Sequence, residues 1–364
     1  MNDKSRRNFI SKLALGTTAM AIPSKLKSSE NNSTEKIILD KNALGFQWNT
    51  LDPFLFCVHH EDYYPKGNDQ LAPDKKDLEG RNIGQDFVVK DGWRMYHGET
   101  VPGFPAHPHR GFETLTVVRR GIVDHADSHG ASGRYGGGDV QWLTAGKGIQ
   151  HSEMFPLVNK DKENTMELFQ IWLNLPAKNK FAKPNYKMFW EKDIPKVNEK
   201  DHNNNNIQIE LIAGEYKNIK AIAPPSDSWA SDPNNHISVW IIKLAPNAQW
   251  TIPSSVDNLN RNLYFYEGDN ITIDNQKIEN YHSVSLTSNK DITIQNGNKD
   301  SSLLFLQGRP INEPVVQYGP FVMNSKEEIQ QAFIDFQKDN FGGWAWGEPG
   351  KTHGTKERFA EYIK

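Results

Sequence analysis

Two stretches of the sequence, HPHRGFET starting at His107 and AGKGIQHSEMF over residues 145–155, each place a metal-ligand type of side chain, skip one residue and place another. Alternate side chains of a β-strand point to the same face, so His107 and His109 share one face, as do His151 and Glu153. Two such strands facing each other bring three imidazoles and one carboxylate to one point, a donor set for a divalent transition metal. A six-coordinate ion held this way keeps two positions for a substrate or dioxygen.

From Ile37 onward the chain is typical of a β-rich protein. Short runs of β-branched and aromatic residues end at Gly, Asn or Asp, which predicts evenly spaced short strands and therefore a sandwich or barrel. The runs are HISVWIIKL (236–244), NLYFYEG (262–268), NITIDNQKI (270–278), DITIQNG (291–297) and SLLFLQG (302–308). Asp274 and Asn275 predict a tight hairpin turn inside the third of these runs.

One helix is predicted, near the C-terminus. Ser325 and Glu328 form a capping box, and Gly342 and Gly343 mark where the helix stops. Its apolar face consists of Ile329, Ala332, Phe333 and Phe336.

The bulk composition describes a chain with room for two cores. Its 364 residues are 37% hydrophobic and 24% charged, which predicts two domains. The net charge of -3 provides no basic field for a nucleic-acid backbone or an anionic membrane. The single cysteine, Cys57, excludes an intramolecular disulfide and a zinc-thiolate motif, and its apolar surroundings PFLFCV predict a buried, inert thiol.

The first 36 residues have the layout of an export signal. SRRNFISK, with Arg6 and Arg7, resembles the twin-arginine motif, and Leu13–Ile22 is an apolar run. That run is too short for a membrane-spanning helix, which needs about 20 residues. Ala19 and Ala21 supply a cleavage site, so we expect a mature periplasmic protein that begins near Ile22. The alternative is a basic N-terminal tail.

Four motifs identify a family. HPHRGFETLTVV, GGGDVQWLTAGKGIQHSEMF, ELFQIWLNLPAKNK and YGPFVMNSKEEIQQAF closely resemble the pirin family of bicupins. The resemblance covers almost all of the mature chain. It implies an all-β protein of two stacked cupin barrels, the first holding a single Fe(2+) and the second lacking a complete metal site. Carried over by motif, the ligands are His107, His109, His151 and Glu153; other divalent transition metals are alternatives to iron.

The expected organisation has four parts. Residues 1–36 are the signal and a polar linker, 37–180 the metal-binding cupin, 181–320 the second cupin and 321–364 a helical tail. The connection between the barrels is expected in NLPAKNKFAKPNY, residues 174–186, because of its prolines and lysines. The histidines of the second half form no His-x-His or His-x-Glu pair, so the second barrel is expected to be structural; these histidines are His202, His236, His282 and His353.

Other polar residues near the motifs leave alternatives. Many cupins use a glutamate at the spacing of Glu113, which we expect to contact a ligand rather than the ion, with metal ligation and a surface carboxylate as the alternatives. DHADSHG offers His125, Asp127 and His129 in alternation, a second metal cluster if read in isolation. The pirin resemblance makes this stretch a turn region, with His129 facing solvent.

Two features depart from the family pattern. CVHHEDYYPKGN places His59 and His60 where the family continues an apolar and acidic run, and the segment Asp62–Gly92 is longer than usual. This insertion is expected to line or cover the mouth of the cavity. The aromatic residues near the motifs are candidates for a pocket wall, with core packing as the alternative for each; they are Phe104, Phe112, Trp142 and Phe155.

Two classes of function follow from the resemblance. Pirin relatives are regarded as quercetin 2,3-dioxygenase-like enzymes and as non-catalytic iron-dependent regulators of transcription. Export favours the enzyme, because a protein outside the cytoplasm does not reach transcriptional machinery. We expect a monomer that binds a flavonol-like substrate and dioxygen, no nucleic acid and no membrane, with Glu153 accepting the flavonol proton. The alternative is an iron-binding or redox-sensing bicupin without turnover.

Overall fold

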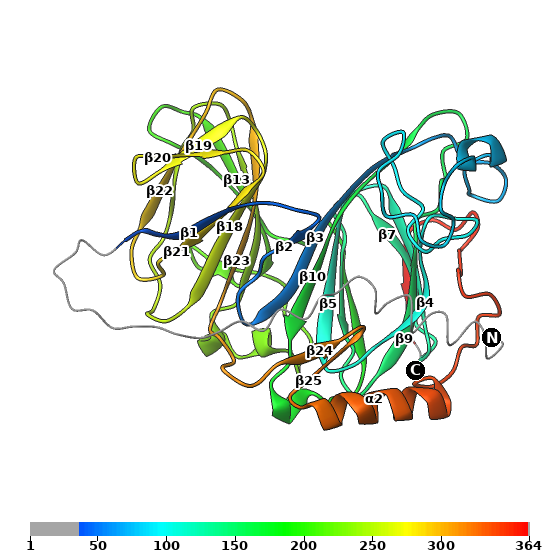
Figure 1. Cartoon of the computed structure of the whole chain (residues 1–364). Coiled ribbons are helices and arrows are strands. Elements are labelled where there is room, and N and C mark those ends of the chain that lie inside the picture. Colours follow the sequence, from blue (N-terminus) through cyan, green and yellow to red (C-terminus); the bar gives the residue numbers. More distant parts are fainter. Residues whose placement is uncertain (1–35, 363–364) are drawn as a thin grey trace.

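The computed structural model describes residues 36–362, so the expected export signal lies outside the described residues. The described chain forms two β-barrels that lie side by side (Figure 1). The predicted all-β class, with two cupin barrels and one short helix near the C-terminus, is confirmed. No helix in residues 36–362 combines the length and apolar character needed to span a membrane.

The first barrel consists of a six-stranded and a five-stranded sheet. In the larger sheet the order is β11-β8-β5-β10-β3-β2, with β2 Gln47–Trp48, β3 Phe54–Tyr64, β5 Phe112–Arg120, β8 Val140–Thr144, β10 Asn164–Asn174 and β11 Asn185–Phe189. In the smaller sheet the order is β26-β7-β6-β9-β4, with β4 Gly103–His109, β6 Ile122–Asp127, β7 Ser132–Gly136, β9 Ile149–Met154 and β26 Phe359–Glu361.

The second barrel pairs a seven-stranded with a four-stranded sheet. The larger sheet, β1-β21-β18-β23-β16-β13-β12, contains β1 Ile38–Ala43, β12 Lys196–Lys200, β13 Asn206–Ala213, β16 Ser238–Leu244, β18 Asn260–Glu267, β21 His282–Leu286 and β23 Ser301–Gly308. The smaller sheet, β17-β22-β19-β20, contains β17 Gln249–Ile252, β19 Asn270–Ile273, β20 Gln276–Glu279 and β22 Ile292–Asn296. The turn residues Asp274 and Asn275 have φ of 49° and 58°, as the predicted tight hairpin requires.

Short elements complete the chain. Two small hairpins are β14 Glu215–Tyr216 with β15 Ile219–Lys220, and β24 Val316–Tyr318 with β25 Phe321–Met323. The 3-10 helices are η2 Lys75–Leu78, η3 Ala177–Asn179, η4 Trp229–Ser231 and η5 Pro233–Asn235. The helix α2 spans Lys326–Asp339, has the predicted Ser325–Glu328 capping box, and ends at Asn340, which has left-handed backbone geometry.

Each end of the described chain adds a strand to the barrel of the other half. β1 pairs with β21 of the second barrel, and β26 pairs with β7 of the first. The expected domain ranges differ from this arrangement: they assign β1 to the first cupin (37–180) and β26 to the helical tail (321–364). The two halves are therefore tied to each other by both ends of the chain.

The larger sheets of the two barrels pack against each other through a shared core. Along β5, Leu115 and Val117 point into this core, where they join Ile241 and Leu304 of the second barrel. Thr116, between them, points the other way, into the first barrel. The two-residue period of a strand thus assigns one face of β5 to the contact between barrels and the other to the barrel interior.

The connection between the barrels is folded onto the first barrel. Lys180, within the expected linker 174–186, is 1% exposed. Its ammonium donates to the carbonyl oxygens of Gly111 and Val322 at 2.8 and 3.1 Å and to Asn174 Oδ1 at 2.9 Å. This buried cation fastens the connection to the start of β5 and to β25.

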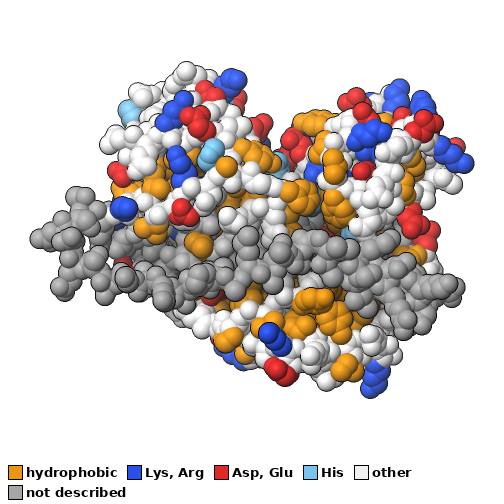
Figure 2. Space-filling model, in the orientation of Figure 1, with side chains coloured by type: hydrophobic (Ala, Val, Ile, Leu, Met, Phe, Trp, Pro, Cys, Tyr) orange, Lys and Arg blue, Asp and Glu red, His pale blue; other side chains and the backbone are white. Residues whose placement is uncertain are grey.

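Charged side chains are mixed over the surface. On the face shown in Figure 2, basic and acidic residues alternate over both lobes without a large area of one sign. This distribution agrees with the small net charge of the chain.

Candidate metal centre

The antiparallel pairing of β4 with β9 brings three histidines together. His107 lies opposite His151, and His109 follows two residues later on the same strand. The ring centroids are 4.5 Å apart for His107 and His151, 4.9 Å for His109 and His151, and 4.8 Å for His107 and His109. One nitrogen of each ring lies within 4.8 Å of the others, and no second such group of His, Cys, Asp or Glu occurs in residues 36–362.

The hydrogen bonds of these histidines fit a bound cation. His107 Nδ1 donates to the carbonyl oxygen of Pro105 at 2.9 Å, so its Nε2 carries the lone pair. His109 Nδ1 and both nitrogens of His151 are buried without a hydrogen-bond partner among the described residues. Buried polar atoms are almost always paired, so these nitrogens fit coordination to a metal ion.

Burial keeps the three imidazoles neutral, which is the metal-binding form. Loss of solvation lowers the pKa of His107 to about 4 and holds the pKa values of His109 and His151 well below the ordinary value. The neighbouring histidines act in the same direction on His109 and His151. His107 is the only partly exposed member of the three, so the site opens on its side.

Glu153 lies beside this triad on β9. Its Oε2 is 3.8 Å from His151 Nε2, while Thr116 donates to its Oε1 at 2.7 Å and Gln170 Nε2 donates to Oε2 at 3.3 Å. Burial raises the pKa of Glu153. The structure therefore brings the three histidines together and places the fourth expected ligand next to them, with its carboxylate held by two residues of the opposite sheet.

Glu113 faces away from the triad. Its carboxylate accepts hydrogen bonds from Thr144 Oγ1 at 2.6 Å and from Ser228 Oγ, a residue that follows the first barrel, at 2.5 Å. It shares a face of β5 with Leu115 and Val117, and burial raises its pKa to about 7. The expectation that Glu113 contacts a metal ligand is not met, because its contacts lie toward the second barrel.

The DHADSHG stretch divides between barrel and surface. His125 and Asp127 are buried opposite Glu153 and His151 in the pairing of β6 with β9, whereas His129 is exposed as expected. Asp127 accepts hydrogen bonds from the backbone amides of His129 and Ala131 and closes a turn. The sequence did not identify His125 as a neighbour of the site, although its alternation with Asp127 indicated that the two share a strand face.

The insertion reaches the open side of the triad. Arg81 fastens it by packing its guanidinium 3.3 Å from the centre of the Trp93 ring and donating to Asp86. Phe87 packs on Phe104, whose ring centroid is 6.3 Å from that of His107. The segment thus contributes to the wall beside the partly exposed histidine.

The other expected wall residues separate into two groups. Phe112 lies 5.1 Å from His109, and Phe155 packs on Phe104. Trp142 belongs to the core between the barrels and is not part of the wall.

Of the two unusual histidines on β3, His60 is held by a hydrogen bond of 2.7 Å between its Nδ1 and the hydroxyl of Tyr96.

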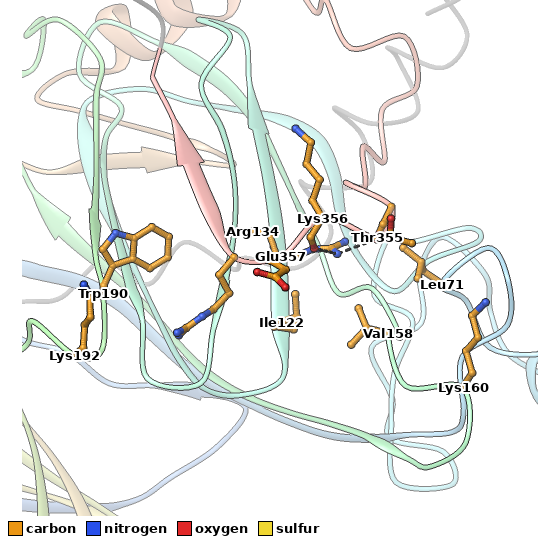
Figure 3. A pocket seen from close by; sticks show the side chains of 12 residues that line it. Leu71, Ile122, Arg134, Val158, Lys160, Trp190, Lys192, Thr355, Lys356 and Glu357 are labelled. Atoms are coloured by element: carbon orange, nitrogen blue, oxygen red, sulfur yellow. Dashed lines mark hydrogen bonds between the residues drawn. The ribbon is translucent and has the colours of Figure 1, made fainter.

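A groove of about 850 Å³ lies on the outside of the first barrel, between residues 354–358 and strands β6 and β7 (Figure 3). Of the basic side chains that line it, three form ion pairs: Arg134 with Asp124, Arg358 with Asp139 and Lys160 with Asp69. None of the three histidines reaches it. We therefore place the functional site at the triad.

Comparison with known proteins gives matches over both barrels. The Pirin family model matches residues 40–173 and the Pirin C-terminal cupin domain matches residues 239–342. The chain is 37% identical to a pirin-like protein of Solanum lycopersicum over 238 residues, 65% of this chain and 75% of that protein. It is 33% identical to Pirin of Homo sapiens over 255 residues, 68% of this chain and 80% of that protein.

Among solved structures, quercetin 2,3-dioxygenase from Acinetobacter baumannii is similar with a TM-score of 0.65 and 26% identity, covering 84% of this chain and 98% of that one. The first family match includes all four expected ligands. Residues beyond 342 lie outside both family matches.

Proposed function

The chain belongs to the pirin family of bicupins, and we propose that it is an Fe(2+)-dependent dioxygenase of the quercetin 2,3-dioxygenase type, acting on flavonol-like substrates. The observation that carries this proposal is the convergence of three neutral imidazoles, of which His109 and His151 have buried nitrogens without a partner, at a site that is open on the side of His107. The likeness to the Acinetobacter baumannii quercetin 2,3-dioxygenase supports the type of reaction.

His107, His109 and His151 would hold the ion, and Glu153, whose Oε2 is 3.8 Å from His151 Nε2, would complete the donor set. An iron ion held by these residues would supply Lewis acidity, which favours the ionised form of the flavonol hydroxyl. Glu153 would accept the flavonol proton through Oε2, which receives only a 3.3 Å hydrogen bond from Gln170 Nε2, whereas Thr116 donates to Oε1 at 2.7 Å. Phe104 and Phe112 form apolar surface beside the histidines and limit the access of water.

Aerobic turnover tests the proposal. Protein reconstituted with Fe(2+) should bleach quercetin over many turnovers, with one dioxygen consumed and one carbon monoxide released per flavonol. His109→Ala protein, purified in the same way, is the matched control for reactions of free iron. Oxygen uptake that stops at one equivalent per iron would favour the alternative, an iron-binding or redox-sensing bicupin.

We also propose that the protein is exported through the twin-arginine route and acts as a periplasmic monomer. Support comes from the sequence alone, in the Arg6–Arg7 pair and the Leu13–Ile22 run. The route carries folded proteins, which suits a chain whose metal is bound before export.

A further inference from the structure

The C-terminal segment, residues 343–362, lies along the smaller sheet of the first barrel, where Figure 1 shows it in red. This is the sheet that carries His107, His109, His151 and Glu153, and the segment lies beyond both family matches. It contacts β4, β6 and β9 in passing and ends as β26, which pairs with β7. The segment therefore spans the ligand-bearing sheet from one edge strand to the other.

Two side chains fasten the C-terminal segment to β6. The indole nitrogen of Trp346 donates to the carbonyl oxygen of Asp127 at 2.7 Å. Nε2 of His353 donates to the carbonyl oxygen of His125 at 2.8 Å. Both acceptors belong to the strand that pairs with β9. These bonds fix the part of the segment that lies between them, residues 347–352, against the sheet.

The other edge of this sheet, β4, contains a β-bulge just before His107. Phe104 lies opposite Glu153 on β9. His107 lies opposite His151, so β4 has one residue more than β9 between these two pairs. In a ladder without the extra residue, Ala106 would take the place opposite His151. The bulge is therefore what brings the His107 side chain to the triad.

One peptide group of the bulge connects the C-terminal segment to His107. Its carbonyl oxygen, that of Pro105, accepts a hydrogen bond from His107 Nδ1 at 2.9 Å. Its amide nitrogen, that of Ala106, donates to the carbonyl oxygen of Pro349 at 2.9 Å. Ala106 is buried, so this N–H depends on Pro349 for its partner. Because a peptide group is planar, fixing its N–H also fixes the direction of its carbonyl.

We propose that the C-terminal segment is a positioning element of the metal centre, in which the Pro349 carbonyl holds the Pro105–Ala106 peptide and this peptide holds the His107 imidazole. The assignment rests on the metal centre of the proposed function and not on its flavonol chemistry. A hydrogen bond to the second nitrogen of a metal-binding histidine fixes its tautomer and ring orientation and raises its basicity. The hydrogen bond to Pro349 polarises the same peptide in the same direction.

Co(2+) binding to metal-free protein tests the positioning role without turnover. Gly350→Leu is the test variant, because a Cβ on Gly350 would lie 3.3 Å from Met154 Cε and the backbone of Gly350 is not left-handed. Met154 is 2% exposed and packs with Ala72 and Val101, so it cannot yield to a leucine, and the segment beside Pro349 should move instead. Competition with a chelator should give a Co(2+) affinity roughly 10- to 100-fold below that of wild type. The visible absorption spectrum of the bound Co(2+) should also change, because His107 changes its orientation.

Ala345→Leu is the matched control, because it adds an apolar side chain to an exposed residue of the same segment, and it should keep the wild-type affinity and spectrum. A chain that ends at Gly342 lacks the whole segment and should lose at least as much affinity as Gly350→Leu. Gly350→Leu, which keeps the segment, decides the question where the shortened chain does not fold.

Wild-type affinity and spectrum in Gly350→Leu, or an equal loss in Ala345→Leu, would overturn the positioning role. The C-terminal segment would then serve the stability of the fold alone, and the proposed function would stand. Failure of the wild-type protein to bind Co(2+) would instead reject the metal centre, and with it both proposals.

Discussion

His151 lies directly opposite His107 across the β4–β9 ladder, with ring centroids 4.5 Å apart. This pairing joins the His-x-His motif of β4 and the His-x-Glu motif of β9, which are some forty residues apart in the chain, into one site. It also makes the site depend on strand register, because a slip of one strand by one residue would turn that strand's histidine out of the barrel.

The first prediction concerns metal content. Wild-type protein should hold one iron per chain, and the double variant His109→Ala/His151→Ala should hold none, because one histidine and Glu153 cannot retain the ion. Elemental analysis of protein refilled with Fe(2+) measures this. His282→Ala, in the second barrel, is the control and should keep one iron. A value near two in wild type would contradict the single site.

The second prediction separates the two glutamates. Glu153→Gln should lower iron affinity and turnover, by roughly 10- to 100-fold if the carboxylate acts through its neighbours and by more if it binds the ion. Glu113→Gln should leave iron affinity unchanged, because Glu113 contacts Thr144 and Ser228 instead of the triad. Competition with a chromogenic chelator gives both affinities. Equal losses in the two variants would mean that Glu113 also serves the metal.

The third prediction concerns pH. Burial raises the pKa of Glu113 from 4.5 to about 7, so the folded state binds more protons than the unfolded state between these values. The stability that Glu113 contributes is present below pH 4.5 and is lost as pH rises through 7. The loss is on the order of 3 kcal/mol, at 1.36 kcal/mol per pKa unit. Urea unfolding at pH 5 and pH 8 should show a smaller decrease for Glu113→Gln than for wild type. Equal decreases in the free energy of unfolding of the two proteins would contradict the raised pKa of Glu113.

The fourth prediction concerns the C-terminal segment. Arg134 is buried, pairs with Asp124, and donates to the carbonyl oxygens of Gly354 and Lys356. Arg134→Met should destabilise the fold by about 3–5 kcal/mol, because Asp124 stays buried without its partner and the segment loses its anchor. Chemical denaturation measures the change. Arg120→Met breaks ion pairs of an arginine that is 48% exposed and should cost less than about 1 kcal/mol. If Arg134→Met and Arg120→Met lowered the free energy of unfolding by similar amounts, burial of the Arg134–Asp124 pair would not explain its contribution.

The fifth prediction concerns export. The mature protein recovered from the periplasm should begin near Ile22, and intact mass determines this directly. Replacing Arg6 and Arg7 by lysine keeps the positive charge but should leave the protein in the cytoplasm, because a twin-arginine receptor reads the pair itself. The reverse exchange outside the motif, Lys25→Arg with Lys27→Arg, is the control and should not change export. Cytoplasmic recovery of the wild-type protein would reject the route.

Several features of the structure follow directly from local sequence. Alternation with a period of two residues indicated that His107 with His109, and His151 with Glu153, share strand faces, and the β4–β9 ladder has that geometry. The hairpin turn at Asp274 and the Ser325 capping box were predicted in the same way, because each depends on residues close together in the chain. Family motifs extended these local patterns to the two-barrel fold.

Long-range pairing explains what local patterns could not reveal. β1 and β26 are short strands whose partners lie in the barrel of the other half, and an edge strand carries no sequence mark of the edge that it will join. Glu113 follows the turn at Gly111, so the alternation of β4 does not continue into β5 and the face of Glu113 could not be counted from His109. The stacking of His125 on Tyr186 forms only when β6 and β11, which belong to different sheets, close the barrel. Sequence spacing specifies which side chains share a strand face, whereas closure of the sheets determines which faces meet.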